Sequence, residues 1–258
     1  MTNVYLFILG TSIGSFLNVL IDRLPKERSI NGRSQCDYCK KKLSGWDLIP
    51  VISFIALGGK CRYCHKRLSF YYPLVEMITG ISFFLIFNFK FLIFNENFKF
   101  QISNSLNLLA LLGIVSCLIV IFFSDLKYQI IPDSIQVALF IFILISNFKF
   151  QILNYLSSGL IVMLPILFLW WVTHGRGMGF GDVKLAFNIG FLLGLKAGML
   201  ALYFGFIIGA VVGLVLIFSK QKKLKSKIAF GPFLVIGTTV ILFFQQPIFD
   251  LIKKIYNY

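Results

Sequence analysis

The chain has 258 residues, of which 58% are hydrophobic and only 14% charged, and its mean hydropathy of +0.85 excludes an ordinary soluble domain. In a soluble protein the formal net charge of +15 would suggest a nucleic-acid partner. In a chain of membrane spans, basic residues instead gather in the loops and set the orientation, so we expect no nucleic-acid partner. The composition therefore predicts an integral membrane protein of several helices, in contact with the lipid bilayer.

The first predicted element is an apolar helix over residues 4–21. The first charged residue is Asp22, so this segment lacks the basic start of a cleaved signal peptide, and we expect it to be retained. Residues 22–70 follow as a long polar segment that carries eleven Lys and Arg residues. The positive-inside rule predicts that this loop is cytoplasmic.

Four of the five cysteines lie in this loop as two Cys-x-x-Cys pairs, Cys36 with Cys39 and Cys61 with Cys64, separated by 21 residues. Four thiolates complete the tetrahedral shell of one structural Zn²⁺. The reducing cytosol favours metal over disulfides. The sequence therefore predicts a zinc-binding loop. Unligated thiols or a redox pair are the alternative, and His65 is expected to be a bystander.

Seven further apolar segments bring the expected number of membrane-spanning helices to about eight. They lie at residues 71–94, 105–124, 134–146 and 153–173, as two spans within 183–219 that join near Gly194, and at 228–250. A second basic segment, residues 220–227, is expected on the cytoplasmic side, so that both termini lie outside. The predicted fold class is an all-α polytopic membrane protein with a cytoplasmic four-cysteine loop after its first helix.

Two aspartates stand at the cytoplasmic ends of predicted spans, where an ionised side chain is costly and marks a functional site. Asp125 closes one apolar run, and Asp182 follows Gly179 and Gly181 at the start of another. Glycine permits the tight turns and close approaches that would aim a carboxylate at a fixed point. Two carboxylates that share one water meet the requirement of an aspartic protease. We therefore predict Asp125 and Asp182 as a catalytic pair.

Other charged residues near these positions are open to two interpretations. Lys127 and Lys184 each lie two residues beyond an aspartate. They either tune the pair or contact the substrate, or they merely mark the cytoplasmic boundary. Glu76 lies one turn inside the span at 71–94, where it either pairs with a loop arginine or belongs to a polar site. Asp133 is expected to start the next helix as its N-cap.

These features, with several short segments around them, resemble the prepilin peptidases, which are bifunctional membrane aspartic proteases. The resemblance covers nearly the whole chain. Beside the cysteine pairs and the two aspartates it includes Gly14-Ser15-Phe16-Leu17-Asn18-Val19, Arg23-Leu24-Pro25, Asp47-Leu48-Ile49-Pro50, Tyr72-Pro73-Leu74-Val75-Glu76, Ile131-Pro132-Asp133 and Phe230-Gly231-Pro232-Phe233. One departure is Tyr71, which precedes Tyr72 where an arginine is common in the family. If that arginine pairs with the acid at Glu76, the pairing here is different.

The resemblance implies that Asp125 and Asp182 are catalytic and that the substrates are prepilins or pseudopilins, which serve type IV pili, type II secretion or DNA uptake. It also implies a second activity of the four-cysteine form, which methylates the new N-terminus with S-adenosylmethionine. On this basis residues 1–94, with the zinc loop at 22–70, are the methylation part, and residues 95–258 are the peptidase domain. The expected location is the cytoplasmic (inner) membrane of a bacterium, with the active site facing the cytosol.

Two other functions share part of this pattern. A presenilin-like intramembrane protease has the same Gly-x-Gly-Asp motif, but it would need a Pro-Ala-Leu segment in a late helix, and the sequence contains none. An ion-coupled transporter also uses paired acids, which it would place at mid-membrane depth on broken helices. The predicted acids lie instead at span ends, on one side. A cleavage assay on a prepilin-like peptide separates the three functions.

Overall fold

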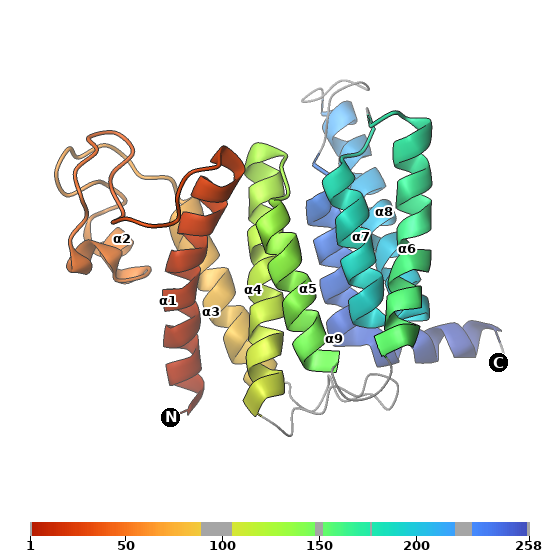
Figure 1. Cartoon of the computed structure of the whole chain (residues 1–258). Helices are drawn as coiled ribbons and strands as arrows, with labels where there is room; N and C mark the ends of the chain where they lie inside the picture. Colours follow the sequence, from red (N-terminus) through yellow and green to blue (C-terminus); the bar gives the residue numbers. More distant parts are fainter. Residues whose placement is uncertain (1, 89–104, 148–151, 176, 220–228, 257–258) are drawn as a thin grey trace. The chain divides into compact units, whose positions relative to one another are not determined.

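The computed structural model describes residues 2–88, 105–147, 152–175, 177–219 and 229–256. Within these ranges the chain is helical, and its only β structure is two isolated bridges in the cysteine loop. It divides into two compact units, Met1–Phe89 and Lys90–Tyr258 (Figure 1). The predicted basic segment at 220–227 lies outside the described ranges, as does the end of the span predicted at 71–94.

Eight helices of 14 residues or more fill the described parts of the segments in which spans are predicted. Five are long and apolar enough to cross a membrane: α1 (Thr2–Arg23), α4 (Ser105–Tyr128), α6 (Ile152–Val172), α8 (Leu195–Phe218) and α9 (Gly231–Tyr256). The other three are shorter: α3 (Tyr71–Asn88), α5 (Asp133–Asn147) and α7 (Phe180–Leu193). The all-helical, multi-pass character is confirmed, and the number of eight spans stays a prediction.

In the first unit, α1 and α3 pack side by side along a seam of small residues. A Cβ atom at Gly10 would lie 2.8 Å from the Cα of Gly80, so only glycine allows the two backbones to approach this closely. The buried amide of Asn18 on α1 donates to the backbone oxygen of Tyr72 on α3 at 3.0 Å. The two helix ends that carry the cysteine loop are thereby held together.

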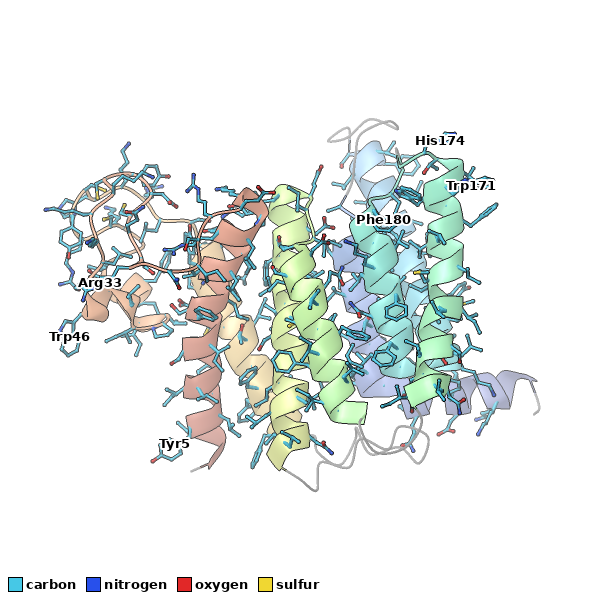
Figure 2. The ribbon with its side chains drawn as sticks, viewed as in Figure 1. Tyr5, Arg33, Trp46, Trp171, His174 and Phe180 are labelled. Atoms are coloured by element: carbon cyan, nitrogen blue, oxygen red, sulfur yellow. The ribbon has the colours of Figure 1, made fainter. Side chains whose placement is uncertain are left out.

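The loop between these helices contains only short elements, η1 (Leu24–Lys26), η2 (Gly45–Leu48) and α2 (Ile52–Ala56). Arg23 organises its start, because one guanidinium nitrogen donates to the carbonyl oxygens of Ser29, Ile30 and Asn31 at 2.9–3.1 Å. Trp46 projects from the loop with 75% of its surface exposed (Figure 2). Tryptophan is enriched where a protein meets the membrane–water interface, and the exposure of Trp46 suits such a position.

The second unit is organised around α7, which packs against α5, α6, α8 and α9. Ten of its 14 residues are buried, as expected for a helix that is apolar on nearly every side. A Cβ atom at Gly190 would lie 2.6 Å from the Cβ of Val162 on α6, so glycine again permits close packing. Because α4 packs against α5 and α9, the last turn of α4 and the first turns of α7 and α9 meet at one end of this unit (Figure 1).

Candidate active site and metal site

Asp125 lies in the last turn of α4 and is only 6% exposed. Its Oδ2 accepts a hydrogen bond of 2.9 Å from the backbone N–H of Gly231, the first residue of α9. The helix ends just beyond it, where Gln129 has a left-handed φ of 55°. The hydroxyl of Ser124 then donates to the carbonyl oxygen of Ile130 at 2.8 Å, which folds the chain back against the site.

Asp182 lies in the first turn of α7 and is also 6% exposed. Its Oδ2 accepts a hydrogen bond of 3.0 Å from the backbone N–H of Gly179, and its own N–H donates to the Gly179 oxygen at 3.1 Å. This reciprocal arrangement fixes the side chain at the helix N-terminus. The other oxygen, Oδ1, is buried and has no hydrogen-bond partner among the described residues. Because a buried carboxylate oxygen is costly unless it is hydrogen-bonded, Oδ1 is the oxygen of Asp182 that can bond to a water molecule or a substrate.

The two carboxylates converge on one place. They lie close enough to each other for a direct electrostatic interaction. The side chain of Ile131 lies against the residue that holds Asp125 and the residue that precedes Asp182: a Cβ atom at Gly231 would lie 3.1 Å from its Cδ1, and one at Gly181 would lie 3.2 Å from its Cβ. The structure therefore brings together the two aspartates that the sequence singled out.

The glycines of the Gly-x-Gly-Asp segment matter because they leave room for neighbouring atoms, and not because they adopt unusual backbone angles. Gly179 has φ −77° and ψ 154°, which any residue adopts, and a Cβ atom there would meet Asp182 Oδ2 at an ordinary 3.5 Å. Gly181 is more restricted, because of its approach to Ile131. The tightest position is Gly231, where a Cβ atom would lie 2.7 Å from Asp125 Oδ2. Sequence reasoning noted Gly231 only as part of a family segment and did not link it to Asp125.

Two buried amides support the first turn of α7, which carries Asp182, and sequence reasoning missed both. Gln136 on α5 donates to the backbone oxygen of Gly181 at 3.0 Å. Asn188 on α7 donates in turn to the Gln136 side-chain oxygen at 2.8 Å. Each amide is 4% exposed. The available signal was a neutral polar residue within an apolar run, which is weaker than the signal of a charge.

The predicted basic residues have other partners. The Lys184 ammonium forms an ion pair of 2.6 Å with Asp133, the first residue of α5, and lies 5.4 Å from the centre of the Phe180 ring. Lys127 is exposed and lies 5.1 Å from the centre of the Tyr128 ring. Asp133 is the first residue of α5, but it is not the N-cap that was expected: the carbonyl oxygen that accepts from the Gln136 N–H belongs to Pro132, and the Asp133 carboxylate bonds to Lys184 instead.

Glu76 on α3 is 8% exposed and accepts a hydrogen bond of 2.8 Å from the backbone N–H of Val51. Val51 has φ 61° and ψ −48°, an unfavourable conformation for a β-branched residue. Of the two interpretations of Glu76, the structure favours a polar site that holds the loop, with a backbone group in the place of an arginine. Tyr71 stands where an arginine is common in the family, and Glu76 accepts its hydrogen bond from the Val51 backbone here.

The four loop cysteines form a cluster with the geometry of a metal site. Their sulfur atoms all lie within 4.8 Å of one another, and those of Cys36 and Cys64 are 3.9 Å apart. A tetrahedron of 2.3 Å zinc–sulfur bonds has sulfur atoms about 3.8 Å apart. Cys36 and Cys61 are each 3% exposed, so the cluster is partly enclosed. Cys36, Cys39, Cys61 and Cys64 therefore fit one tetrahedral ion.

The two Cys-x-x-Cys segments repeat one structure. In each, the backbone N–H four residues after the first cysteine returns to the carbonyl oxygen of that cysteine, at 2.9 Å from Lys40 and 3.0 Å from His65. A lysine just after each segment lies over a tyrosine ring of the other segment. The Lys41 ammonium lies 5.0 Å from the centre of the Tyr63 ring, and that of Lys66 lies 4.9 Å from the centre of the Tyr38 ring.

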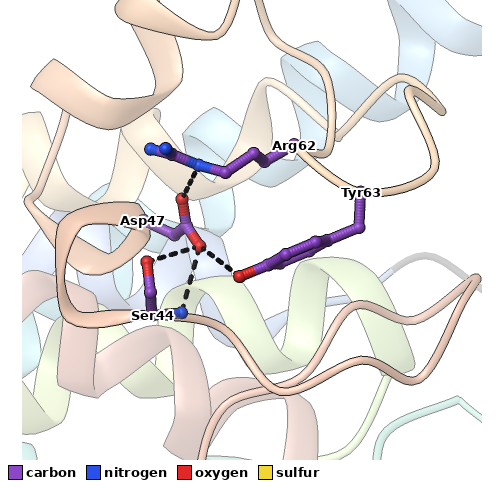
Figure 3. A network of polar contacts seen from close by, with 4 residues as sticks. All are labelled: Ser44, Asp47, Arg62 and Tyr63. Carbon is purple, nitrogen blue, oxygen red and sulfur yellow. Dashed lines mark hydrogen bonds and ion pairs between the residues drawn. The ribbon is translucent and has the colours of Figure 1, made fainter.

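Asp47, in η2, is bonded to the second Cys-x-x-Cys segment, as Figure 3 shows. It accepts hydrogen bonds from the backbone N–H and hydroxyl of Ser44 at 3.0 and 2.8 Å, from Arg62 at 2.6 Å and from the Tyr63 hydroxyl at 3.4 Å. Although burial opposes it, the bonds from Ser44 and the Arg62 guanidinium lower the pKa of Asp47 below its usual value. The loop thus has a polar framework in addition to the metal ligands.

A helical membrane bundle with two adjoining buried carboxylates has the architecture of a membrane aspartic peptidase. Comparison with known proteins agrees with this class. Residues 8–90 match the Bacterial Peptidase A24 N-terminal domain, and residues 111–214 match the Type IV leader peptidase family. The chain belongs to the type IV leader peptidase family, which is a family of enzymes.

Its curated relatives carry the name prepilin leader peptidase/N-methyltransferase. A Bacillus subtilis protein is 30% identical over 253 residues, which cover 96% of this chain and 97% of that protein. A Myxococcus xanthus protein is 32% identical over 83% of this chain and 63% of its own length, and one from Pseudomonas aeruginosa is 28% identical over 93% and 90%. No solved structure matches the chain.

Proposed function

We propose that the protein is a membrane aspartic endopeptidase that removes the short basic leader from type IV prepilins or pseudopilins and then methylates the new N-terminus. The observation that carries the peptidase activity is the pair of buried carboxylates of Asp125 and Asp182. Each has one oxygen held by a glycine N–H, and Asp182 Oδ1 is buried without a partner among the described residues. The family membership favours this function over a presenilin-like protease or a transporter.

The chemistry follows from the closeness of the two acids. Two neighbouring carboxylates cannot both ionise cheaply, so the pair holds one proton. The ionised carboxylate takes a proton from a water molecule as that water attacks the scissile carbonyl carbon, and the protonated carboxyl donates to the carbonyl oxygen. When the carbon–nitrogen bond breaks, the leaving amine takes up a proton from the pair. The bonds from Gly231 and Gly179 orient one oxygen of each carboxylate and leave the other for the shared water.

The depth of the two aspartates suits a substrate that stays in the membrane. Asp125 is three residues from the end of α4, and Asp182 is the third residue of α7. At 1.5 Å per residue, both lie roughly 4 Å inside the helix ends. We infer eight spans with residues 22–70 and 220–227 on the cytoplasmic side, because these segments are strongly basic. The scissile bond then lies just below the cytoplasmic surface of the bacterial inner membrane, with the apolar segment of the substrate in the bilayer.

The methylation activity is assigned to residues 1–94 and the peptidase activity to residues 95–258. S-adenosylmethionine supplies the methyl group that the new N-terminal amine accepts. The four cysteines would hold one Zn²⁺ with no open coordination position, so the ion stabilises the loop and takes no chemical part. Glu76 secures the same loop through Val51.

The test of the peptidase site is leader removal from a recombinant prepilin by the purified full-length protein in detergent. Asp125→Asn and Asp182→Asn should each lower the rate on the order of 10³-fold or more, because an amide cannot share the proton. The control is Asp133→Asn. It breaks only a solvent-exposed ion pair, with side chains 71% and 38% exposed, worth at most about 1 kcal/mol.

Zinc content and unfolding temperature should match the wild-type values in all three variants, which separates lost chemistry from lost fold. Near wild-type cleavage by Asp182→Asn would overturn the assignment of the pair. So would an Asp133→Asn variant as inactive as Asp125→Asn.

A further inference from the structure

A second polar site lies at the other end of the second unit, away from the aspartates. It is a cavity of about 460 Å³ between the first turns of α6 and α8, the end of α7 and the last part of α9. Its polar lining consists of Asn154, Tyr155, Ser158, Lys196, Gln245 and Lys253. Leu193, the last residue of α7, also lines it. Leu193 is eleven residues from Asp182, or roughly 16 Å along the helix, so the cavity is separate from the active site.

The last part of α9 forms one wall because the helix changes direction. Phe244 has non-helical angles, φ −121° and ψ 24°, and Pro247 follows within the same helix. Proline removes a backbone donor and clashes with the preceding turn, which accounts for a kink here. Figure 1 shows the segment after the kink running across the end of the bundle rather than along it.

This segment has the character of a helix at a membrane surface. Ile248 and Phe249 are half-buried, whereas Asp250, Lys253 and Lys254 are exposed. A helix with one apolar and one charged face lies in the plane of the interface. Because the kink turns this segment across the bundle, the cavity beside it lies at the end of the second unit opposite the aspartates, next to a helix suited to the interface.

The charge of the cavity matches an anionic headgroup. Its two cationic lining residues are Lys196 and Lys253, and none of its ten lining residues is acidic; Asp250, beside Phe249 on the same helix, does not line it. For neither lysine does the described part of the chain contain an ion pair. The amides and hydroxyls beside them supply donors to phosphate oxygens. Leu153 and Leu195, next to lining residues along the chain, are 81% and 40% exposed and offer apolar surface to acyl chains.

We propose that this cavity binds the phosphate headgroup of an anionic phospholipid through Lys196 and Lys253. The lipid bridges the start of α8 and the kinked end of α9, and it holds the interfacial segment against the bundle. In the proposed orientation this end faces the outer leaflet. A basic pocket between membrane helices is a recurrent way of binding such headgroups.

The experiment measures phosphatidylglycerol bound to the purified full-length protein by native mass spectrometry, with thermal unfolding in the same detergent as a second readout. Phosphatidylcholine and inorganic phosphate are the two comparison ligands. Wild-type protein should bind phosphatidylglycerol and unfold at a higher temperature with it. The Lys196→Gln, Lys253→Gln double variant should bind it roughly 10- to 30-fold more weakly.

Lys254→Gln is the matched control, because Lys254 is the next residue on the same helix, is exposed and does not line the cavity. It should bind phosphatidylglycerol as the wild type does. Leader cleavage and zinc content of the double variant should be close to wild type, which shows that it is folded. Equal binding by the double variant and the wild type would overturn the proposal. Equal binding of phosphatidylcholine would do so too, and equal binding of inorganic phosphate would identify a free-anion site instead.

Discussion

Replacing Gly231 with alanine tests whether the backbone of α9 holds the carboxylate of Asp125. The Gly231 N–H donates to Asp125 Oδ2 at 2.9 Å, and a Cβ atom on the same residue would lie 2.7 Å from that oxygen. Ordinary contacts of a Cβ atom begin near 3.4 Å. The oxygen therefore has to retreat by roughly 0.7 Å. Because a misplacement on the order of 1 Å costs on the order of 10²-fold in rate, we expect Gly231→Ala to lower leader cleavage about 10- to 100-fold.

Gly179→Ala is the comparison variant, because Gly179 makes the same kind of bond to Asp182 with more room around it. Its N–H donates to Asp182 Oδ2 at 3.0 Å, but a Cβ atom would lie 3.5 Å from that oxygen. The backbone angles of Gly179, φ −77° and ψ 154°, also suit alanine. We expect the rate to fall several-fold at most, which is far less than for Gly231→Ala.

The assay is the initial rate of leader removal from a recombinant prepilin by purified full-length protein in detergent, followed by gel mobility. Zinc content and unfolding temperature are measured on the same samples, so that a folding defect is recognised. A wild-type rate for Gly231→Ala would refute the inference that the close approach of α9 positions Asp125. An equal loss in both alanine variants would refute the distinction between the two contacts.

Three further predictions follow from the zinc loop, the buried amides and the orientation. Replacing Cys36 and Cys39 with serine should lower bound zinc, measured by atomic emission, from about one ion per chain to near none, with a smaller loss of cleavage than for an aspartate variant; unchanged zinc would contradict the site. Asn188→Leu leaves the Gln136 side-chain oxygen buried without its donor, at a cost of about 1–3 kcal/mol. Both the unfolding temperature and the cleavage rate should fall. If neither changes, the two amides do not support the first turn of α7. The new thiol of an Arg33→Cys variant should not react with an impermeant thiol reagent in intact cells, because the loop is predicted to be cytoplasmic. Labelling of that thiol would contradict the predicted orientation.

The helices, the cysteine cluster and the two aspartates were predictable from sequence because each leaves a local signal. An apolar run long enough to span a bilayer forms a helix, since no other structure within one segment satisfies its backbone. Two Cys-x-x-Cys pairs in a short loop have few uses other than metal binding. The charges of Asp125 and Asp182 are conspicuous beside apolar runs. The amides of Gln136 and Asn188 are not, although the structure buries them just as deeply.

Only the tertiary structure decided what holds these side chains. Gly231 bonds to Asp125 across 106 residues because α9 packs against α4. Lys184 is two residues from Asp182 in the sequence, yet it pairs with Asp133 because α5 packs against α7. The physical reason is that these helices are apolar on nearly every side, so that periodicity does not specify which faces meet. Close glycine contacts select the neighbours, and the hydrogen bonds of the site depend on that selection.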